Sequence, residues 1–181
     1  MNFIDSNTAL LVIDVQEKLV PSISEKEEML LNTLKCIKAA KLIGLPLVYT
    51  EQYPKGLGIT VAELRGDLDD APVFEKTDFS CLASDGLKNF LKKNKVKKVL
   101  LVGIEAHICV FQTARDLIAA GYEVLVVADA VSSRKDFDKK WALKNLREMG
   151  TAVSTFECFF MEYLKGSKHP LFREMSAILK L

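Results

Sequence analysis

The stretch that decides the fold is Val99-Leu100-Leu101-Val102-Gly103-Ile104-Glu105-Ala106-His107-Ile108-Cys109. Its first four residues are all apolar, which is typical of a strand buried on both faces of a parallel sheet. Residues 106–120 have helical spacing, so the chain predicts a strand, a glycine turn and a helix in succession. Cys109 then falls in the first turn of that helix, just beyond the carboxyl end of the strand, where open α/β sheets bind their ligands.

The position of Cys109 leaves two interpretations open. The amino terminus of a helix stabilises a thiolate and lowers the pKa of a thiol, which favours a nucleophile. Free cysteines are, however, more often small buried core residues. We expect this second role for Cys36, Cys81 and Cys158, which do not follow a strand and a glycine turn.

Short apolar runs alternate with stretches of helical spacing along the whole chain. Such alternation predicts parallel strands joined by right-handed helical crossovers. We therefore predict an α/β fold: a three-layer, doubly wound, Rossmann-like sheet of six parallel strands in the order 3-2-1-4-5-6, formed by one domain over residues 1–181. The predicted strands are residues 8–13, 45–50, 73–75, 98–102, 123–128 and 151–154; the predicted helices are residues 25–43, 80–94, 106–120, 136–149 and 157–164; and residues 53–66 are predicted to form a loop with one short helix.

The composition excludes several classes of protein. The 181 residues contain 25 Lys and Arg and 24 Asp and Glu, for a formal net charge of +1, so no nucleic-acid or membrane partner is predicted. No apolar run is long enough to span a bilayer, and residues 1–5 lack signal-peptide features, so we expect a cytoplasmic protein with reduced thiols. Four cysteines without a Cys-x-x-Cys pair, and two histidines, predict no zinc site. No Gly-x-Gly-x-x-Gly motif follows the first strand, which argues against a dinucleotide site.

Two further strand ends place polar side chains at the same edge of the sheet. Asp14 follows the first strand and Lys76 follows the third. Alone, Asp14 is explained as a turn cap and Lys76 as a solvated lysine, while Asp78 or Ser80 can cap the next helix. With Cys109, however, the aspartate supplies a base and the lysine favours the thiolate, and backbone N–H groups of the turn can bind an oxyanion. This set predicts attack on an amide or another acyl carbon through a covalent thioester.

The sequence around these three residues matches one known superfamily. The matching segments are Leu11-Val12-Ile13-Asp14-Val15-Gln16, Glu75-Lys76-Thr77-Asp78-Phe79-Ser80, Gly103-Ile104-Glu105-Ala106-His107-Ile108-Cys109-Val110 and Ala128-Asp129-Ala130-Val131-Ser132-Ser133-Arg134. They resemble the isochorismatase-like cysteine hydrolases, which include nicotinamidases, N-carbamoylsarcosine amidases and isochorismatases. Residues 50–58, 103–106 and 169–172 resemble the isochorismatase domain-containing proteins most closely. A ribonuclease label carried by some of those proteins finds no support in these residues or in the charge balance.

The resemblance implies a role for each residue of the set. Cys109 would be the nucleophile, Asp14 the general base and Lys76 the group that stabilises the thiolate. The resemblance also implies a cis peptide bond between Ile104 and Glu105, which would aim the backbone N–H groups of Glu105 and Cys109 at one oxyanion position. The protein would be a cofactor-free hydrolase of a small amide or related compound, and a homo-oligomer, as members of the superfamily usually are.

One departure from the superfamily concerns metal binding. Metal-dependent nicotinamidases carry an Asp-x-His motif after the second strand. Here that place is taken by Glu51-Gln52-Tyr53-Pro54. The sequence therefore predicts no catalytic metal, and nicotinamide is not the expected substrate.

Several polar and aromatic side chains fall on loops at the predicted ligand edge. His107 is two residues before Cys109, and its alternative role is a helix-start residue that faces solvent or a subunit interface. The expected lining of the substrate pocket is Gln16, Gln52, Tyr53, Phe79 and His107. The aromatic residues that fit a subunit interface and the core equally well are Trp141, Phe156, Phe159, Phe160 and Tyr163.

A non-catalytic scaffold or binding protein is the alternative function. Such a protein would keep the fold and the three side chains without turnover. It is favoured if the pocket is closed and Lys76 is out of reach of Cys109.

Overall fold

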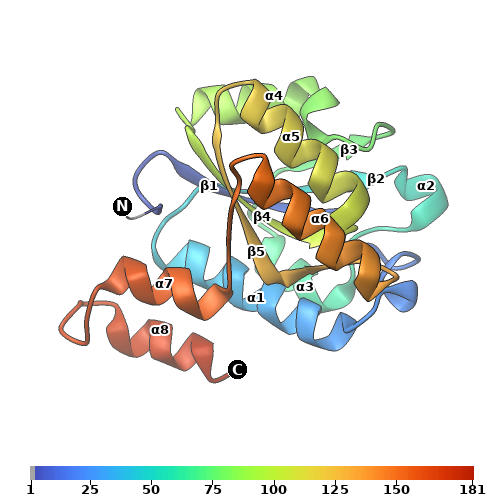
Figure 1. The fold of residues 1–181 in the computed structure, drawn as a ribbon. Coiled ribbons are helices and arrows are strands. Elements are labelled where there is room, and N and C mark those ends of the chain that lie inside the picture. The colour runs from blue at the N-terminus through green and yellow to red at the C-terminus, as the bar shows by residue number, and fades with distance from the viewer. Residues whose placement is uncertain (1–2) are drawn as a thin grey trace.

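A six-stranded sheet forms the centre of the computed structural model, which describes residues 3–181 (Figure 1). The strand order is β3-β2-β1-β4-β5-β6, and every neighbouring pair is parallel. The predicted α/β fold and strand order are thereby confirmed. The strands are β1 (Thr8–Ile13), β2 (Leu47–Gln52), β3 (Val73–Lys76), β4 (Lys98–Ile104), β5 (Glu123–Ser132) and β6 (Ala152–Ser154).

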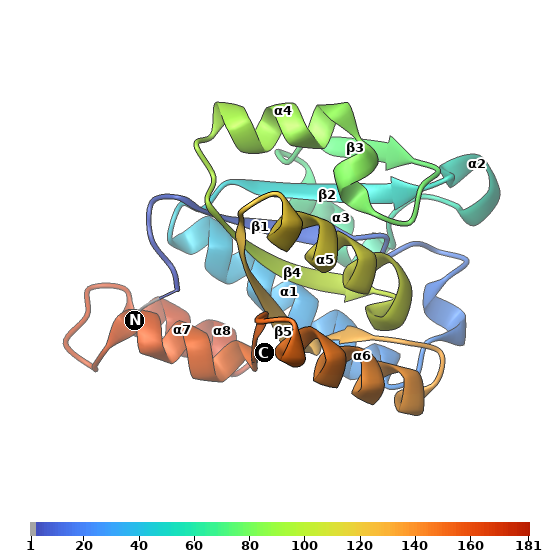
Figure 2. The same ribbon diagram turned by 45° about the horizontal axis from the view of Figure 1, so that its top comes forward.

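Helices cover both faces of the sheet and complete the three layers (Figure 2). One face carries α1, α3, α7 and α8, and the other carries α4, α5 and α6. Among residues 3–181, no helix is both long and apolar enough to cross a membrane. The helices are α1 (Lys26–Leu42), α2 (Pro54–Leu57), α3 (Ala62–Leu68), α4 (Asp85–Lys93), α5 (Phe111–Ala119), α6 (Asp136–Glu148), α7 (Phe156–Leu164) and α8 (Phe172–Leu179).

Alternate residues of the central strands face opposite layers, which gives the sheet two apolar cores. In β1, Leu10 and Val12 belong to the core that includes α1 and α7, whereas Leu11 and Ile13 belong to the core that includes α4 and α5. All six residues of β1 are buried, and the next residue, Asp14, is buried as well. The first polar group after this strand is therefore held inside the protein.

One predicted helix starts later than the sequence suggests. The helix expected at residues 80–94 begins as α4, after the 3₁₀ turn Cys81–Ala83. Its N-cap is Ser84, whose hydroxyl accepts a hydrogen bond from the backbone N–H of Leu87 at 3.4 Å. The expectation that Asp78 or Ser80 caps this helix is therefore wrong.

Two other boundaries also differ from the prediction. The helix expected at residues 106–120 begins as a wide π-helical turn, Ala106–Val110, before α5. The segment 53–66 contains α2 and the start of α3, two short helices rather than one. The strand topology is unaffected, because both changes lie in connections between strands.

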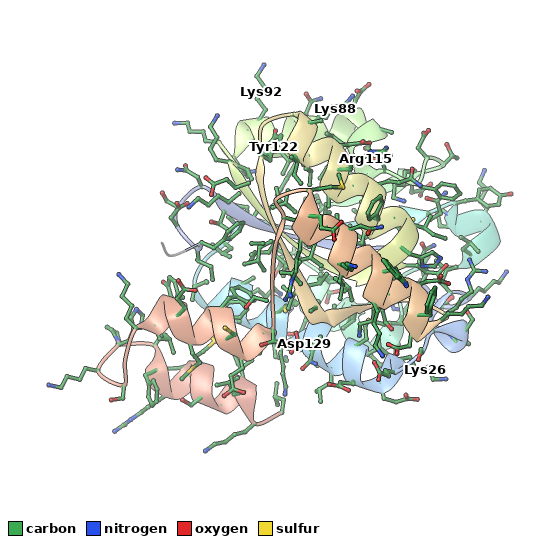
Figure 3. All side chains as sticks on the ribbon, in the orientation of Figure 1. Lys26, Lys88, Lys92, Arg115, Tyr122 and Asp129 are labelled. Carbon is green, nitrogen blue, oxygen red and sulfur yellow. The ribbon has the colours of Figure 1, made fainter. Side chains whose placement is uncertain are left out.

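An irregularity in β5 matters for the candidate site. The pairing of β5 with β4 shifts between Leu101 and Gly103, where β5 accommodates extra residues. The extra residues include Asp129 (Figure 3). Its carbonyl accepts a hydrogen bond from Asn32 Nδ2 at 3.0 Å, and its Oδ1 accepts one from Phe156 N at 2.9 Å. The shift places the last residues of β5 beside the turn that follows β4.

Gly103→Ala is expected to lower the free energy of unfolding by about 3 kcal/mol or more. Gly103 has φ +107°, and a Cβ atom there would run into the backbone of Ile13 on β1. Gly121→Ala is the matched control, because Gly121 also has a positive φ of +86° but a Cβ atom there meets nothing within 4 Å. The control is expected to cost about 1–2 kcal/mol, from backbone strain alone. Urea unfolding measures both changes, and equal losses at the two positions would contradict the clash with Ile13.

Candidate active site

Three strand ends meet at the carboxyl edge of the sheet. Asp14 directly follows β1, Lys76 ends β3, and Cys109 lies in the π-helical turn after β4. The Lys76 ammonium lies 2.6 Å from Asp14 Oδ2 and 3.8 Å from Cys109 Sγ. The side chains of Lys76 and Asp14 are 2% and 0% exposed, so solvent does not screen their charges. The structure thus brings together the three residues that the sequence singled out.

The Lys76 ammonium is surrounded by acceptors. Besides Asp14, Gln52 Oε1 lies at 2.6 Å, and the carbonyl oxygens of Asp78 and Phe79 each lie at 3.2 Å. Burial alone would lower the pKa of Lys76, but the charge of Asp14 and the hydrogen bond to it act in the opposite direction, and the pKa lies above its ordinary value. Lys76 is therefore a cation at neutral pH. The stability that this shift contributes is lost only as the pH rises above the ordinary lysine range.

The Asp14 carboxylate is held by a residue that the sequence did not single out. Thr50 Oγ1 donates to Asp14 Oδ1 at 2.7 Å and lies 3.5 Å from Cys81 Sγ. Burial raises the pKa of the Cys81 thiol to about 11, and the charge of Asp14 adds to the rise. With Thr50 on one oxygen and Lys76 on the other, the carboxylate has a fixed orientation. The pairing register of β1 and β2 would have indicated this role of Thr50, because Thr50 on β2 pairs with Ile13, the residue before Asp14.

The environment of Cys109 favours the neutral thiol in the resting site. Cys109 is 7% exposed. Burial raises the pKa of its thiol, and the charge of Asp14 and a hydrogen bond with Asp14 raise it further, while the charge of Lys76 opposes the rise. The expectation that the helix start lowers this pKa is therefore wrong. Cys109 is instead a thiol beside a carboxylate that can accept its proton.

The turn that leads to Cys109 contains the expected cis peptide bond between Ile104 and Glu105. The Glu105 carbonyl accepts hydrogen bonds from the N–H groups of Ile108 at 3.1 Å and Val110 at 3.2 Å. These bonds close the wide turn that connects Glu105 with Cys109. The prediction of the cis bond, which came from the family resemblance, is confirmed.

Gln16 and Gln52 do not lie where a substrate could contact their amides. Gln16 is 0% exposed, and its amide binds the Gln52 backbone N–H at 2.7 Å, the Gln52 carbonyl at 2.9 Å and the Gly58 carbonyl at 2.6 Å. The Gln52 amide accepts from Lys76 and donates to the Thr77 carbonyl at 2.6 Å. Gln52 therefore holds Lys76, and Gln16 holds the Gln52 backbone and the loop at Gly58, which corrects the expectation that the two amides line the pocket.

The other three expected pocket residues are more accessible. Tyr53 and Phe79 are 54% and 53% exposed. Tyr53 lines a cavity of about 350 Å³ with neighbouring residues that include Lys76, although neither Asp14 nor Cys109 is among its lining residues. The His107 ring is partly buried, and its Nδ1 lies 2.9 Å from the Ser133 hydroxyl. These side chains have surface left for a ligand, although His107 is also tied to the end of β5.

The other cysteines are of two kinds. Cys36 and Cys81 are buried, as expected. Cys158 is exposed, so the expectation that it is a core residue is wrong. It lies on α7, whose inward face is formed by larger side chains, including Phe159 and Phe160.

Glu51, the first of the residues that take the place of the Asp-x-His motif, lies in β2 and has its own hydrogen-bond partners. The Glu51 carboxylate accepts hydrogen bonds from the backbone N–H and the hydroxyl of Thr60, at 2.7 and 2.8 Å. Across residues 3–181, no three His, Cys, Asp or Glu side chains are grouped so that they could hold a metal ion.

This architecture is an isochorismatase-type hydrolase fold. Residues 8–158 match the isochorismatase domain, and the chain belongs to the isochorismatase family. It is 37% identical over 172 residues to isochorismatase domain-containing protein 2 of Danio rerio, covering 95% of this chain and 86% of that protein. It is also 37% identical over 180 residues to isochorismatase domain-containing protein 1 of Salmo salar, covering 99% of this chain but only 63% of that longer protein.

A solved structure agrees with these relatives. The structure of MAR1 ribonuclease from Caenorhabditis elegans superposes with a TM-score of 0.92 and 41% sequence identity, covering 100% of this chain and 92% of that chain. The similarity therefore extends over the whole sheet and both helical layers.

Proposed function

We propose that this protein is a cysteine hydrolase that needs no cofactor and acts on a small amide or related acyl compound, with residues 1–181 as one catalytic domain. The observation that carries the proposal is the Lys76 ammonium, which contacts Asp14 at 2.6 Å and Cys109 at 3.8 Å in a shielded site. A buried ion pair is costly to desolvate and contributes little net stability. The place of this ion pair beside a thiol is therefore better explained by a catalytic role than by a contribution to the stability of the fold.

Asp14 acts as the general base in the acylation step. As the Cys109 sulfur attacks the carbonyl carbon, the thiol proton moves to the Asp14 carboxylate and the carbonyl electron pair moves onto oxygen. The tetrahedral oxyanion then collapses, the C–N bond breaks, and the leaving nitrogen takes the proton from Asp14. The product on the enzyme is a thioester of Cys109.

Water completes the reaction in the deacylation step. Asp14 takes a proton from water as the water oxygen attacks the thioester carbon. The C–S bond then breaks, and the proton passes to the Cys109 sulfur. Lys76 stays charged and stabilises the negative charge on sulfur, while the backbone N–H groups of Glu105 and Cys109 bind the oxyanion in both steps.

We further propose that Tyr53, Phe79 and His107 face the substrate and that the protein is a cytoplasmic homo-oligomer. Phe137 and Trp141 on α6 are 69% and 47% exposed, and their ring centroids lie 6.2 Å apart. Adjacent exposed aromatic side chains favour a contact with another protein surface. The remaining aromatic candidates pack in or against the core: Phe156, Phe159, Phe160 and Tyr163.

A non-catalytic binding protein is the competing function. The contact between Lys76 and Cys109 counts against it, because a binding protein has no need to keep an ammonium group next to a thiol. Ribonuclease is part of the name of the Caenorhabditis elegans protein and describes that protein. In this chain, the thiol and the carboxylate suit attack on an acyl carbon, and a net charge of +1 offers little attraction for RNA.

p-Nitrophenyl acetate is expected to acetylate Cys109, because the ester presents an acyl carbon to the thiol and the carboxylate. Peptide mass spectrometry at timed intervals locates and quantifies the adduct. A mixture of small amides, tested in the same way, is expected to leave on Cys109 an acyl group whose mass identifies part of the substrate.

Cys158 is the internal control for this experiment, since it is exposed and lacks the carboxylate and the ammonium. Asp14→Asn is expected to suppress the adduct on Cys109 and to leave labelling of Cys158 unchanged. Labelling of Cys109 no faster than that of Cys158 in the wild-type protein would count against the proposed function.

A further inference from the structure

Arg134 clamps the carboxylate of Glu105, the residue that follows the cis bond. Its backbone N–H donates to Glu105 Oε2 at 2.9 Å, its Nε donates to the same oxygen at 3.2 Å, and its Nη2 donates to Oε1 at 2.9 Å. The side chain of Glu105 is 10% exposed, whereas that of Arg134 is 56% exposed. One residue therefore binds both oxygens of a nearly buried carboxylate.

The residues just before Arg134 hold the same turn. After the irregularity in β5, the strand pairs with β4 as far as Ile104 opposite Ser132. The next hydroxyl, that of Ser133, lies 2.9 Å from His107 Nδ1. The end of β5 thus contacts the turn through its backbone, and the next two residues, Ser133 and Arg134, contact it through their side chains. Arg134 is the only charged residue among residues 131–134.

We propose that Arg134 is a positioning residue for the oxyanion site, an inference that rests on the proposed hydrolase function. By binding the Glu105 side chain, it fixes the direction of the Glu105 backbone N–H, one of the two proposed oxyanion donors. It also neutralises the Glu105 carboxylate, which would otherwise place an uncompensated negative charge near the developing oxyanion. Arg134 acts on the reaction through Glu105 and not by touching the reacting atoms.

Two reactions of Cys109 distinguish the oxyanion site from the nucleophile. Acetylation by p-nitrophenyl acetate passes through a tetrahedral oxyanion, whereas alkylation by iodoacetamide is a displacement at a saturated carbon and forms none. Arg134→Ala is expected to slow acetylation of Cys109 by about 10- to 100-fold and to leave its alkylation within about twofold of the wild-type rate. Peptide mass spectrometry measures both rates at Cys109.

Two further variants separate position from charge. Arg134→Lys keeps the charge but lacks the forked pair of donors, so it is expected to recover only part of the acetylation rate. Glu105→Gln in the Arg134→Ala background removes the unpaired carboxylate, and it is expected to recover part of the rate through charge alone. If Arg134→Ala does not fold, Arg134→Lys and Glu105→Gln, compared with the wild type, still test the clamp by the same pair of reactions.

The outcomes separate this inference from the proposed function. Equal acetylation rates in the wild type and Arg134→Ala would overturn the inference and leave the hydrolase standing. Parallel losses of acetylation and alkylation would also overturn it, because they would indicate a general disturbance around Cys109. Absence of acetylation at Cys109 in the wild type would overturn the proposed function, and the inference with it.

Discussion

Cys109→Ala is expected to abolish turnover, with a loss of about 10⁵-fold or more in the rate of acyl transfer. The residue is the proposed attacking atom, and the other thiol near Asp14, that of Cys81, is 0% exposed and cannot replace it. The fold is expected to survive, because the side chain that is removed is small and the site keeps its ion pair. The free energy of unfolding is therefore expected to change by only about 1 kcal/mol.

Release of p-nitrophenol and urea unfolding together test this prediction. Cys158→Ala is the matched control, because it removes an exposed thiol without touching the site, and it is expected to retain full activity. Cys109→Ser is expected to lose activity to a similar extent, since a hydroxyl is a much weaker acid than a thiol. Residual turnover in Cys109→Ala that approaches the wild-type rate would contradict the role of Cys109 as nucleophile.

The common position of the three site residues could be predicted because parallel strands leave a plain signal. Strands such as β1 and β4 are buried on both faces, so a polar residue at their carboxyl end stands out. Parallel topology then brings the ends of all strands to one edge. Asp14, Lys76 and Cys109 share that edge for this reason. The distances of 2.6 and 3.8 Å between them depend on side-chain packing, which the sequence does not show.

The direction of a side chain at the ligand edge was the part that could not be predicted. Gln16 and Tyr53 both lie on connections at this edge, yet Gln16 is 0% exposed and Tyr53 is 54% exposed. The difference arises because the Gln16 amide binds three backbone groups, two of Gln52 at the end of β2 and one of Gly58. Thr50 was missed for a related reason, since its role depends on which residue of β1 it faces.

The pKa of Cys109 likewise depends on contacts that the sequence does not show. The sequence reveals the helix start, a local feature that lowers the pKa of a thiol. It does not reveal the extent of burial or the closeness of Asp14, both of which raise that pKa against the opposing charge of Lys76. The contact between Arg134 and Glu105 also could not be predicted from the sequence, because it depends on the shifted pairing of β5 with β4.

Lys76→Met is expected to lower the free energy of unfolding by about 3–5 kcal/mol and to abolish acylation of Cys109. Methionine has a similar length, so the loss of packing is small. The variant leaves the Asp14 carboxylate buried at 0% side-chain exposure, with the Thr50 hydroxyl at 2.7 Å but without a compensating charge. Acylation fails because the negative charge that develops on sulfur then faces this carboxylate without a cation between them.

The double variant Asp14→Asn/Lys76→Met separates the two effects. It removes both charges, so it is expected to regain most of the lost stability while remaining inactive. Lys38→Met is the matched control: it breaks the partly exposed Lys38–Asp67 ion pair at 2.8 Å and is expected to change the free energy of unfolding by less than about 1 kcal/mol. Urea unfolding and acetylation of Cys109 are measured on all four proteins, including the wild type. A double variant no more stable than Lys76→Met would contradict the buried-charge explanation, and acetylation of Cys109 at the wild-type rate in either site variant would contradict the role of Lys76.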